Sequence, residues 1–180
     1  MKSIKSMSLG ELAALVSTHL DSKGISCVLS GGACVTIYTH NRYLSYDLDF
    51  IERFSTSRKE LRIALAELGF YEEHRYFKHH GTEFFIEFPA GPLSVGSEPV
   101  KQIEELSFET GILFLLSPTD CVKDRLVAYY FWNDRQALEQ AKLVSKNQPV
   151  DLDEIRRWSE VEDQIDKFEE IKRDLGVFSS

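Results

Sequence analysis

Two pairs of residues in the first third of the sequence have types and spacing that could handle phosphate and metal. Gly31 and Gly32 follow an apolar run, and Asp47 and Asp49 stand one residue apart among apolar neighbours. A glycine pair lets a ligand approach the backbone closely because no Cβ stands in the way. A helix that starts there offers free N–H groups and the positive end of its dipole to phosphate, and Ser30 adds a hydroxyl. A tight turn that binds nothing is the alternative for the glycines.

The aspartate pair has the chemistry of a site for a divalent cation. In a β-strand, residues i and i+2 project from the same face, about 6.6 Å apart along the chain. Asp47 and Asp49 would therefore share one face, while Leu48 and Phe50 face the core. Two carboxylates on one face repel each other unless a cation or hydrogen bonds compensate, and they are the hard oxygen ligands that Mg²⁺ prefers. The alternative is a half-exposed strand whose polar face carries two acids.

A third carboxylate would complete such a site. In the segment from Thr82 to Phe88, strand alternation places Glu83 and Glu87 on one face. Glu87 has the more apolar surroundings and is the predicted third ligand, with Glu83 as the fallback. A surface acid on an edge strand is the alternative for both.

The elements that must position these residues can be predicted from caps, chain breakers and apolar spacing. Capping boxes at Ser8 with Glu11 and at Ser57 with Glu60 mark two helix starts, and Ser117-Pro118 marks another. We predict helices over residues 8–22, 32–40, 57–68, 118–132, 134–146 and 151–175. We predict strands over residues 25–30, 42–51, 74–78, 82–88, 93–96 and 108–116.

This order of elements indicates the fold class. Helices and strands mix in the first part and helices alone follow, which predicts an α/β (α+β) fold with a mixed sheet flanked by helices. We expect an α/β core over residues 1–116 and a C-terminal helical part over residues 117–180 that packs on it.

Composition narrows the classes of protein further. With 180 residues, 43% of them apolar, the chain can form a globular core. It has no run of about 18 apolar residues, so we expect no membrane span, and the absence of an apolar signal core predicts a cytoplasmic protein. The net charge is −8, but residues 151–180 alone contain ten acidic and five basic side chains, which leaves room for a basic surface elsewhere.

The two motifs together resemble the signature of the polymerase-beta-like nucleotidyltransferase superfamily. That signature is a glycine pair opening a helix, then an acid-x-acid strand, here Asp47-Leu48-Asp49-Phe50, then a third acid on a neighbouring strand. The stretch from Arg42 to Phe50 looks closest to the minimal and abortive-infection toxin-type members, in which an arginine and a small hydroxyl residue precede the acid pair. The resemblance covers roughly residues 25–146.

Two other features bear on the resemblance. Residues 116–126 are similar to a later helix of those proteins, where a basic residue faces the nucleotide, and Lys123 and Arg125 are the candidates here. On the other hand, the link between Gly32 and Asp47 is long for the compact members, and the third acid is a glutamate where aspartate is commoner.

What the resemblance implies is a transferase that moves a nucleoside monophosphate from a nucleoside triphosphate to an acceptor hydroxyl and releases pyrophosphate. It implies two Mg²⁺ ions, or Mn²⁺ in their place, held by Asp47, Asp49 and Glu87. It also implies a nucleotide and phosphate site made of Ser30, Gly31, Gly32, Ser45 and Lys123 or Arg125. The two cations are ordinary helix-surface side chains in the alternative interpretation.

Several alternatives stay open at the level of sequence. The acceptor could be a tRNA end, a protein or a small molecule, and a partner protein or a homodimer would also fit. A second hypothesis is a non-catalytic nucleotide- or partner-binding module of a toxin–antitoxin pair. A third, a Rossmann-type dinucleotide binder, lacks the full G-x-G-x-x-G motif. The basic segment from His74 to His80 could contact RNA or simply be solvated.

Overall fold

The computed structural model describes residues 2–176 of the chain and has the mixed α+β architecture that the order of elements predicts. Its centre is a seven-stranded sheet with the order β3-β4-β5-β2-β1-β9-β8. In chain order these strands are β1 (Cys27–Ser30), β2 (Asp47–Glu52), β3 (Tyr71–Glu73), β4 (Tyr76–Lys78), β5 (Phe85–Glu87), β8 (Ile103–Phe108) and β9 (Gly111–Leu116). A small separate hairpin consists of β6 (Ser94–Val95) and β7 (Glu98–Pro99).

The sheet is mixed because strand direction changes at the strand that carries the two aspartates. β2 runs antiparallel to β1 and parallel to β5, and β1 is parallel to β9. Antiparallel pairing beside β2 excludes the parallel βαβ unit of a Rossmann-type dinucleotide site.

Three of the helices begin at the capping residues that the sequence predicts. The helices are η1 (Ile4–Ser6), α1 (Leu9–Ser22), α2 (Gly31–Tyr38), α3 (Arg58–Ala66), α4 (Pro118–Trp132), α5 (Arg135–Asn147), α6 (Leu152–Val161) and α7 (Ile165–Leu175). Ser8 and Ser57 form complete capping boxes with Glu11 and Glu60, and the Ser117 hydroxyl caps α4 ahead of Pro118. These bonds satisfy N–H groups that the first helical turn leaves free.

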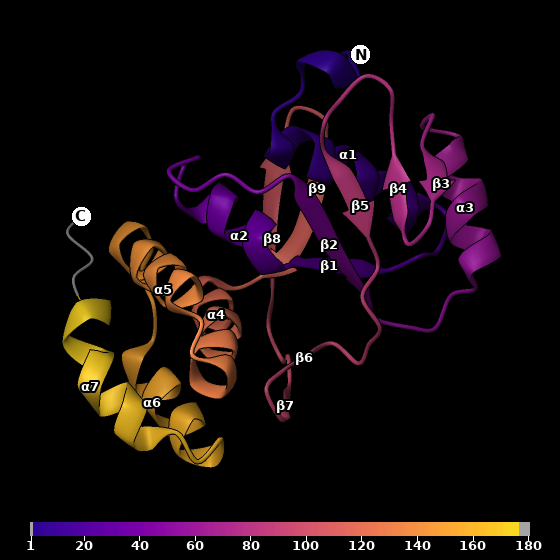
Figure 1. Cartoon of the computed structure of the whole chain (residues 1–180). Coiled ribbons are helices and arrows are strands. Elements are labelled where there is room, and N and C mark those ends of the chain that lie inside the picture. Colours follow the sequence, from indigo (N-terminus) through magenta and orange to yellow (C-terminus); the bar gives the residue numbers. More distant parts are fainter. Residues whose placement is uncertain (1, 177–180) are drawn as a thin grey trace.

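Figure 1 shows how the two groups of helices sit around the sheet. α3 lies beside the β3 edge, whereas α4 to α7 lie together next to α2, away from α3. Apolar side chains of the sheet and of α4 to α7 belong to one continuous core, which includes Leu29, Phe50, Leu115 and Trp158. No helix among the described residues is both long and apolar enough to cross a membrane.

The single strand predicted over 108–116 is wrong, because residues 109–110 form the turn that joins β8 to β9. Other predictions about elements were also wrong, for the following physical reasons. The strand predicted over 42–51 begins only at Asp47, because residues 42–46 form the link from α2. The helix predicted over 151–175 is interrupted at Asp163, whose φ of 58° no α-helix accepts. β3 and β8 were missed because neither is strongly apolar: no residue of β8 is fully buried, and β3 lies at the sheet edge.

Candidate active site

The acidic strand β2 presents its carboxylates on one face of the sheet. Leu48 and Phe50 are fully buried, and Asp47 and Asp49 are half-buried on the opposite side of the strand. The strand alternation inferred from sequence is therefore present, with apolar side chains anchoring the strand and acids facing away from them.

The neighbouring strand β5 brings a third acid into register. In the parallel pairing of β2 with β5, Asp49 is opposite Glu87 and Asp47 is opposite Phe85. Residues in register on adjacent strands point to the same side, so Glu87 shares the face of the two aspartates. Glu83 is exposed and precedes β5, outside this register. Of the two glutamates, Glu87 is the one that lies beside Asp49.

The glycine pair lies directly against these acids. Gly31 starts α2 with a φ of +67°, a conformation that glycine adopts without strain, and a Cβ there would be 2.6 Å from Asp49 Oδ2. A Cβ on Gly32 would be 3.1 Å from Ser45 Oγ. The start of α2 therefore packs on the face that carries the acids, at a distance that leaves no room for side chains.

Ser30 bonds to the backbone of Asp49, and Ser45 bonds to the side chain of Asp47. The Ser30 hydroxyl donates to the carbonyl oxygen of Asp49 at 3.2 Å and forms no cap bond with α2. The Ser45 hydroxyl donates to Asp47 Oδ1, and the Ser45 amide donates to Thr36 Oγ1 on α2 at 2.9 Å. The first N–H groups of α2 are thus left without a side-chain cap.

The three carboxylates give the site more negative than positive charge. Burial, followed by the charges of Asp47 and Glu87, raises the pKa of Asp49 to about 7, and Arg125 opposes this rise. Arg125 lies on α4, where its guanidinium binds Asp124 and reaches Gln140 Oε1 at 3.4 Å. Arg125, whose charge acts on Asp49, is therefore already paired with Asp124.

Arg75 is a contact of the site that sequence reasoning did not place there. Its Nε lies 3.2 Å from Glu87 Oε1, and its guanidinium stacks over the Tyr76 ring at 4.9 Å. The basic segment around Arg75 is visible in the sequence, but no local pattern specifies the register between β4 and β5. The structure pairs Tyr76 with Glu87, which brings the turn before Tyr76 to the third acid.

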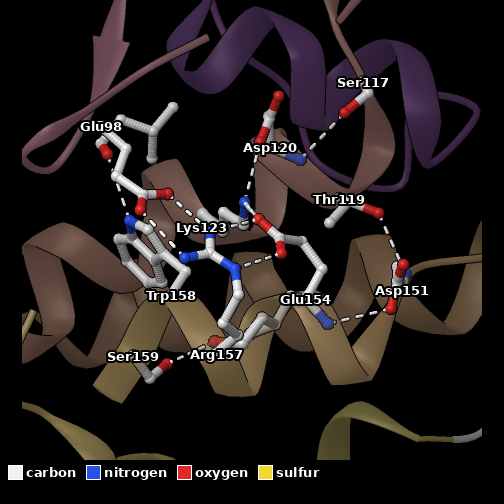
Figure 2. A network of polar contacts seen from close by, with 12 residues as sticks. Glu98, Ser117, Thr119, Asp120, Lys123, Asp151, Glu154, Arg157, Trp158 and Ser159 are labelled. Carbon is white, nitrogen blue, oxygen red and sulfur yellow. Dashed lines mark hydrogen bonds and ion pairs between the residues drawn. The ribbon is translucent and has the colours of Figure 1, made fainter. Parts of the chain in front are cut away.

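Lys123 lies in a different cluster, among acidic side chains of α4 and α6. Its ammonium is 2.7 Å from Glu154 Oε1 and 3.3 Å from Asp120 Oδ1, and its side chain is only 7% exposed. Arg157 then joins Glu154 to Glu98 of β7, as Figure 2 shows. The structure does not bring Lys123 into contact with the β2 acids, and both of its carboxylate partners neutralise its charge.

This cluster borders a cavity of about 580 Å³ between the β6–β7 hairpin, the start of α4 and α6. Its charged lining is mainly acidic and includes Glu98, Glu104, Asp120, Glu154 and Arg157. Lys123 and Arg157 are already paired with carboxylates, and Lys101, the other cation of the lining, is exposed to solvent, so the only buried cation that the cavity offers a triphosphate, Lys123, is already engaged.

The residues of the candidate site can be compared with the needs of a divalent cation. Carboxylate oxygens are the ligands that Mg²⁺ uses, and three of them lie on adjacent strands. In the described part of the chain, residues 2–176, no three His, Cys, Asp or Glu side chains already surround one point as a metal cage. Asp47 accepts a hydrogen bond from Ser45 at one carboxylate oxygen, and Glu87 pairs with the exposed Arg75. The three carboxylates supply the oxygen ligands that a magnesium ion prefers.

Comparison with known proteins gives similarity in structure and not in sequence. Neither a protein-family model nor a curated protein sequence matches the chain. The crystal structure of an antigenic nucleotidyltransferase-like protein from Paracoccidioides brasiliensis superposes with a TM-score of 0.60 at 12% identity, covering 97% of this chain and 96% of that one. The crystal structure of ANT(2″)-Ia in complex with adenylyl-2″-tobramycin gives 0.53 at 11% identity, covering 86% and 96%. The chain therefore has the fold of nucleotidyltransferase-like proteins.

Proposed function

We propose that the protein is a metal-dependent nucleotidyltransferase. It would transfer a nucleoside monophosphate from a nucleoside triphosphate to an acceptor hydroxyl and release pyrophosphate. The observation that carries the proposal is the register of Asp49 with Glu87 on adjacent parallel strands, with Asp47 on the same face and the Gly31-Gly32 helix start packed against them. The fold shared with nucleotidyltransferase-like proteins supports it.

In this proposal Asp47, Asp49 and Glu87 would hold Mg²⁺. The bound metal would neutralise the triphosphate and stabilise both the attacking and the leaving oxygens. Burial, and then the neighbouring carboxylates, raise the pKa of Asp49, and a bound cation would favour its ionised form, which agrees with this role.

The chain's own residues would bind and orient the nucleotide. The N–H groups at the start of α2 have no side-chain cap and lie at the positive end of the helix dipole, which favours phosphate. Gly31 and Gly32 leave the backbone there open to a ligand. Ser45 would keep Asp47 in position through its hydroxyl. Arg125 would offset part of the triphosphate charge, since its field already reaches Asp49. Lys123 could bind phosphate only after breaking its ion pairs with Asp120 and Glu154, so we assign the larger contribution to Arg125.

The acceptor belongs to one of three classes: an RNA end, a protein side chain or a small molecule. One structure with the same fold holds an adenylylated small molecule, which supports including such acceptors in the search. The acceptor oxygen would bond to the α-phosphorus while the bond to pyrophosphate breaks, and the hydroxyl proton would pass to water or a carboxylate.

The experiment is a transfer assay with the four nucleoside triphosphates, each labelled at the α-phosphate. Purified protein and Mg²⁺ are incubated with cellular RNA, cellular protein and a small-molecule extract, and labelled products are separated and identified by mass spectrometry. We expect label in one acceptor class, abolished by EDTA and by Asp49→Asn but retained by Glu83→Gln. Glu83 is the matched control, since it is an exposed acid that precedes the same strand.

The same assay separates the proposal from a non-catalytic nucleotide-binding module. Such a module would bind a triphosphate in an Asp49-dependent manner but would transfer no label and release no pyrophosphate with any acceptor. Transfer that survives Asp49→Asn would contradict the assignment of the site.

A further inference from the structure

Arg75 links the turn between β3 and β4 to the third acid of the site. Its Nε–Glu87 Oε1 distance is 3.2 Å, while its side chain is 69% exposed and that of Glu87 is 21% exposed. An ion pair with one exposed partner is weak and exchanges readily. The third acid is therefore engaged by a cation that can leave.

The backbone of this turn is fixed although the Arg75 side chain is not. Arg58 of α3 donates from Nη2 to the carbonyl oxygen of Arg75 at 2.8 Å and from Nε to Glu72 Oε1 at 2.8 Å. His74 adopts a φ of 57°, which closes the two-residue turn. Arg75 can thus change partners by side-chain rotation alone, because its Cα is held in place.

The charges around Arg75 favour such an exchange. Contact with Tyr76, and then the charges of Glu87 and Asp49, raise the pKa of Arg75, so the acids of the site favour the charged guanidinium. A divalent ion bound by the three acids would take over the neutralisation of Glu87. The Arg75 guanidinium would then be unpaired and close to the phosphates of a bound nucleotide. Its planar set of donors suits phosphate oxygens.

We propose that Arg75 is a nucleotide-binding residue that neutralises Glu87 until metal binds and then transfers its hydrogen bonds to the phosphates of the nucleotide. The inference rests on the proposed function, since it requires metal at the acids. It gives Arg75 two opposite effects: competition with free metal, and attraction of the metal–nucleotide complex.

The test measures the binding of two probes. Mn²⁺ alone is titrated by electron paramagnetic resonance, and the four α,β-methylene nucleoside triphosphates with Mg²⁺ are titrated by calorimetry, because these analogues cannot transfer the nucleotide. The variants are Arg75→Gln, which removes the charge, and Arg75→Lys, which retains it. Arg62→Gln is the matched control, since Arg62 is an exposed arginine that pairs with Glu72 and not with the acids.

For Arg75→Gln we expect Mn²⁺ to bind about two- to fivefold tighter, the size of an exposed ion pair, and the nucleotide analogue to bind about tenfold weaker. Arg75→Lys should stay close to wild type for Mn²⁺ and recover part of the nucleotide affinity. Arg62→Gln should change neither affinity. A loss of both affinities in Arg75→Gln, as expected for a merely structural residue, or no change in either, would overturn the inference.

Failure of the inference can be told apart from failure of the proposed function. If wild type binds Mn²⁺ and Asp49→Asn abolishes that binding, the metal site stands whatever Arg75 does. If wild type binds Mn²⁺ and nucleotide with no dependence on Asp49, the proposed function fails, and the role of Arg75 fails with it.

Discussion

Replacing Asp49 by asparagine should stabilise the metal-free protein at pH 8 and change its stability little near pH 4. The folded protein raises the pKa of this carboxyl from 3.8 to about 7 through burial and the charges of Asp47 and Glu87. The folded state therefore keeps a proton that the unfolded chain has already lost between those two values. The contribution of Asp49 to the free energy of unfolding must therefore fall as the pH rises through this window and level off above pH 7.

The magnitude follows from the size of the shift. A difference of about 3 pKa units corresponds to about 4 kcal/mol at 1.36 kcal/mol per unit, and solvent contact of the half-buried side chain makes this an upper bound. Asparagine is nearly isosteric with aspartate and never ionises. The variant should thus gain up to about 4 kcal/mol at pH 8, and its profile should lose the part of the slope that Asp49 contributes.

The assay is urea unfolding in EDTA at pH values from 4 to 8, with wild type, Asp49→Asn and Glu83→Gln. Subtracting the profiles removes the titration of groups common to all three proteins. Glu83→Gln supplies the comparison for an exposed acid. If Asp49→Asn raised the stability by the same amount at pH 5 and pH 8, or lowered it at pH 8, the electrostatic account of the site would be wrong.

Three further substitutions should have distinct effects. Gly31→Ala places a Cβ 2.6 Å from Asp49 Oδ2 at a φ of +67°, so we expect a loss of about 1–3 kcal/mol in chemical unfolding and weaker Mn²⁺ binding. Lys123→Ala removes the buried cation between two carboxylates and should cost about 1–3 kcal/mol in unfolding, because Glu154 keeps Arg157 as a partner, while nucleotide binding stays near wild type; a selective loss of nucleotide affinity at unchanged stability would instead assign Lys123 to phosphate. Ser45→Ala frees the carboxylate of Asp47 and should weaken Mn²⁺ binding about tenfold without changing the circular dichroism spectrum; unaltered Mn²⁺ affinity would remove Ser45 from the site.

The parts of the fold that sequence could predict are those set by local chemistry. Capping residues such as Ser57 and Ser117 determine where helices start, and the alternation in β2 assigns Leu48 and Asp49 to opposite faces. These features depend on the nearest few residues, which is why a single sequence was enough to predict them.

The parts that escaped prediction depend on contacts between distant segments. The break at Asp163 separates two stretches that each have helical spacing, and it lets Trp158 of α6 and Phe168 of α7 both reach the core. The register of β4 with β5 brings Arg75 to Glu87, and no local pattern specifies a register.

In the candidate site, too, local patterns could be predicted and contacts between distant segments could not. The acid pair, the glycine pair and Glu87 were expected together, and the structure places them on one face. Lys123 and Arg125 stand two positions apart on one helix, and sequence gave no means to choose between them. The charge of Arg125 acts on Asp49, whereas the nearest acids to Lys123 come from α6 and its own helix.

The central claim is that the acids of β2 and β5 bind metal and nucleotide together, and the most direct test is a crystal grown with Mn²⁺ and an α,β-methylene nucleoside triphosphate that binds in solution. Anomalous diffraction locates manganese without reference to any assumed site. We predict manganese between Asp47, Asp49 and Glu87, with the triphosphate at the start of α2. Manganese or triphosphate in the cavity bordered by Lys123 and Arg157, with the β2 acids unbound, would contradict the account.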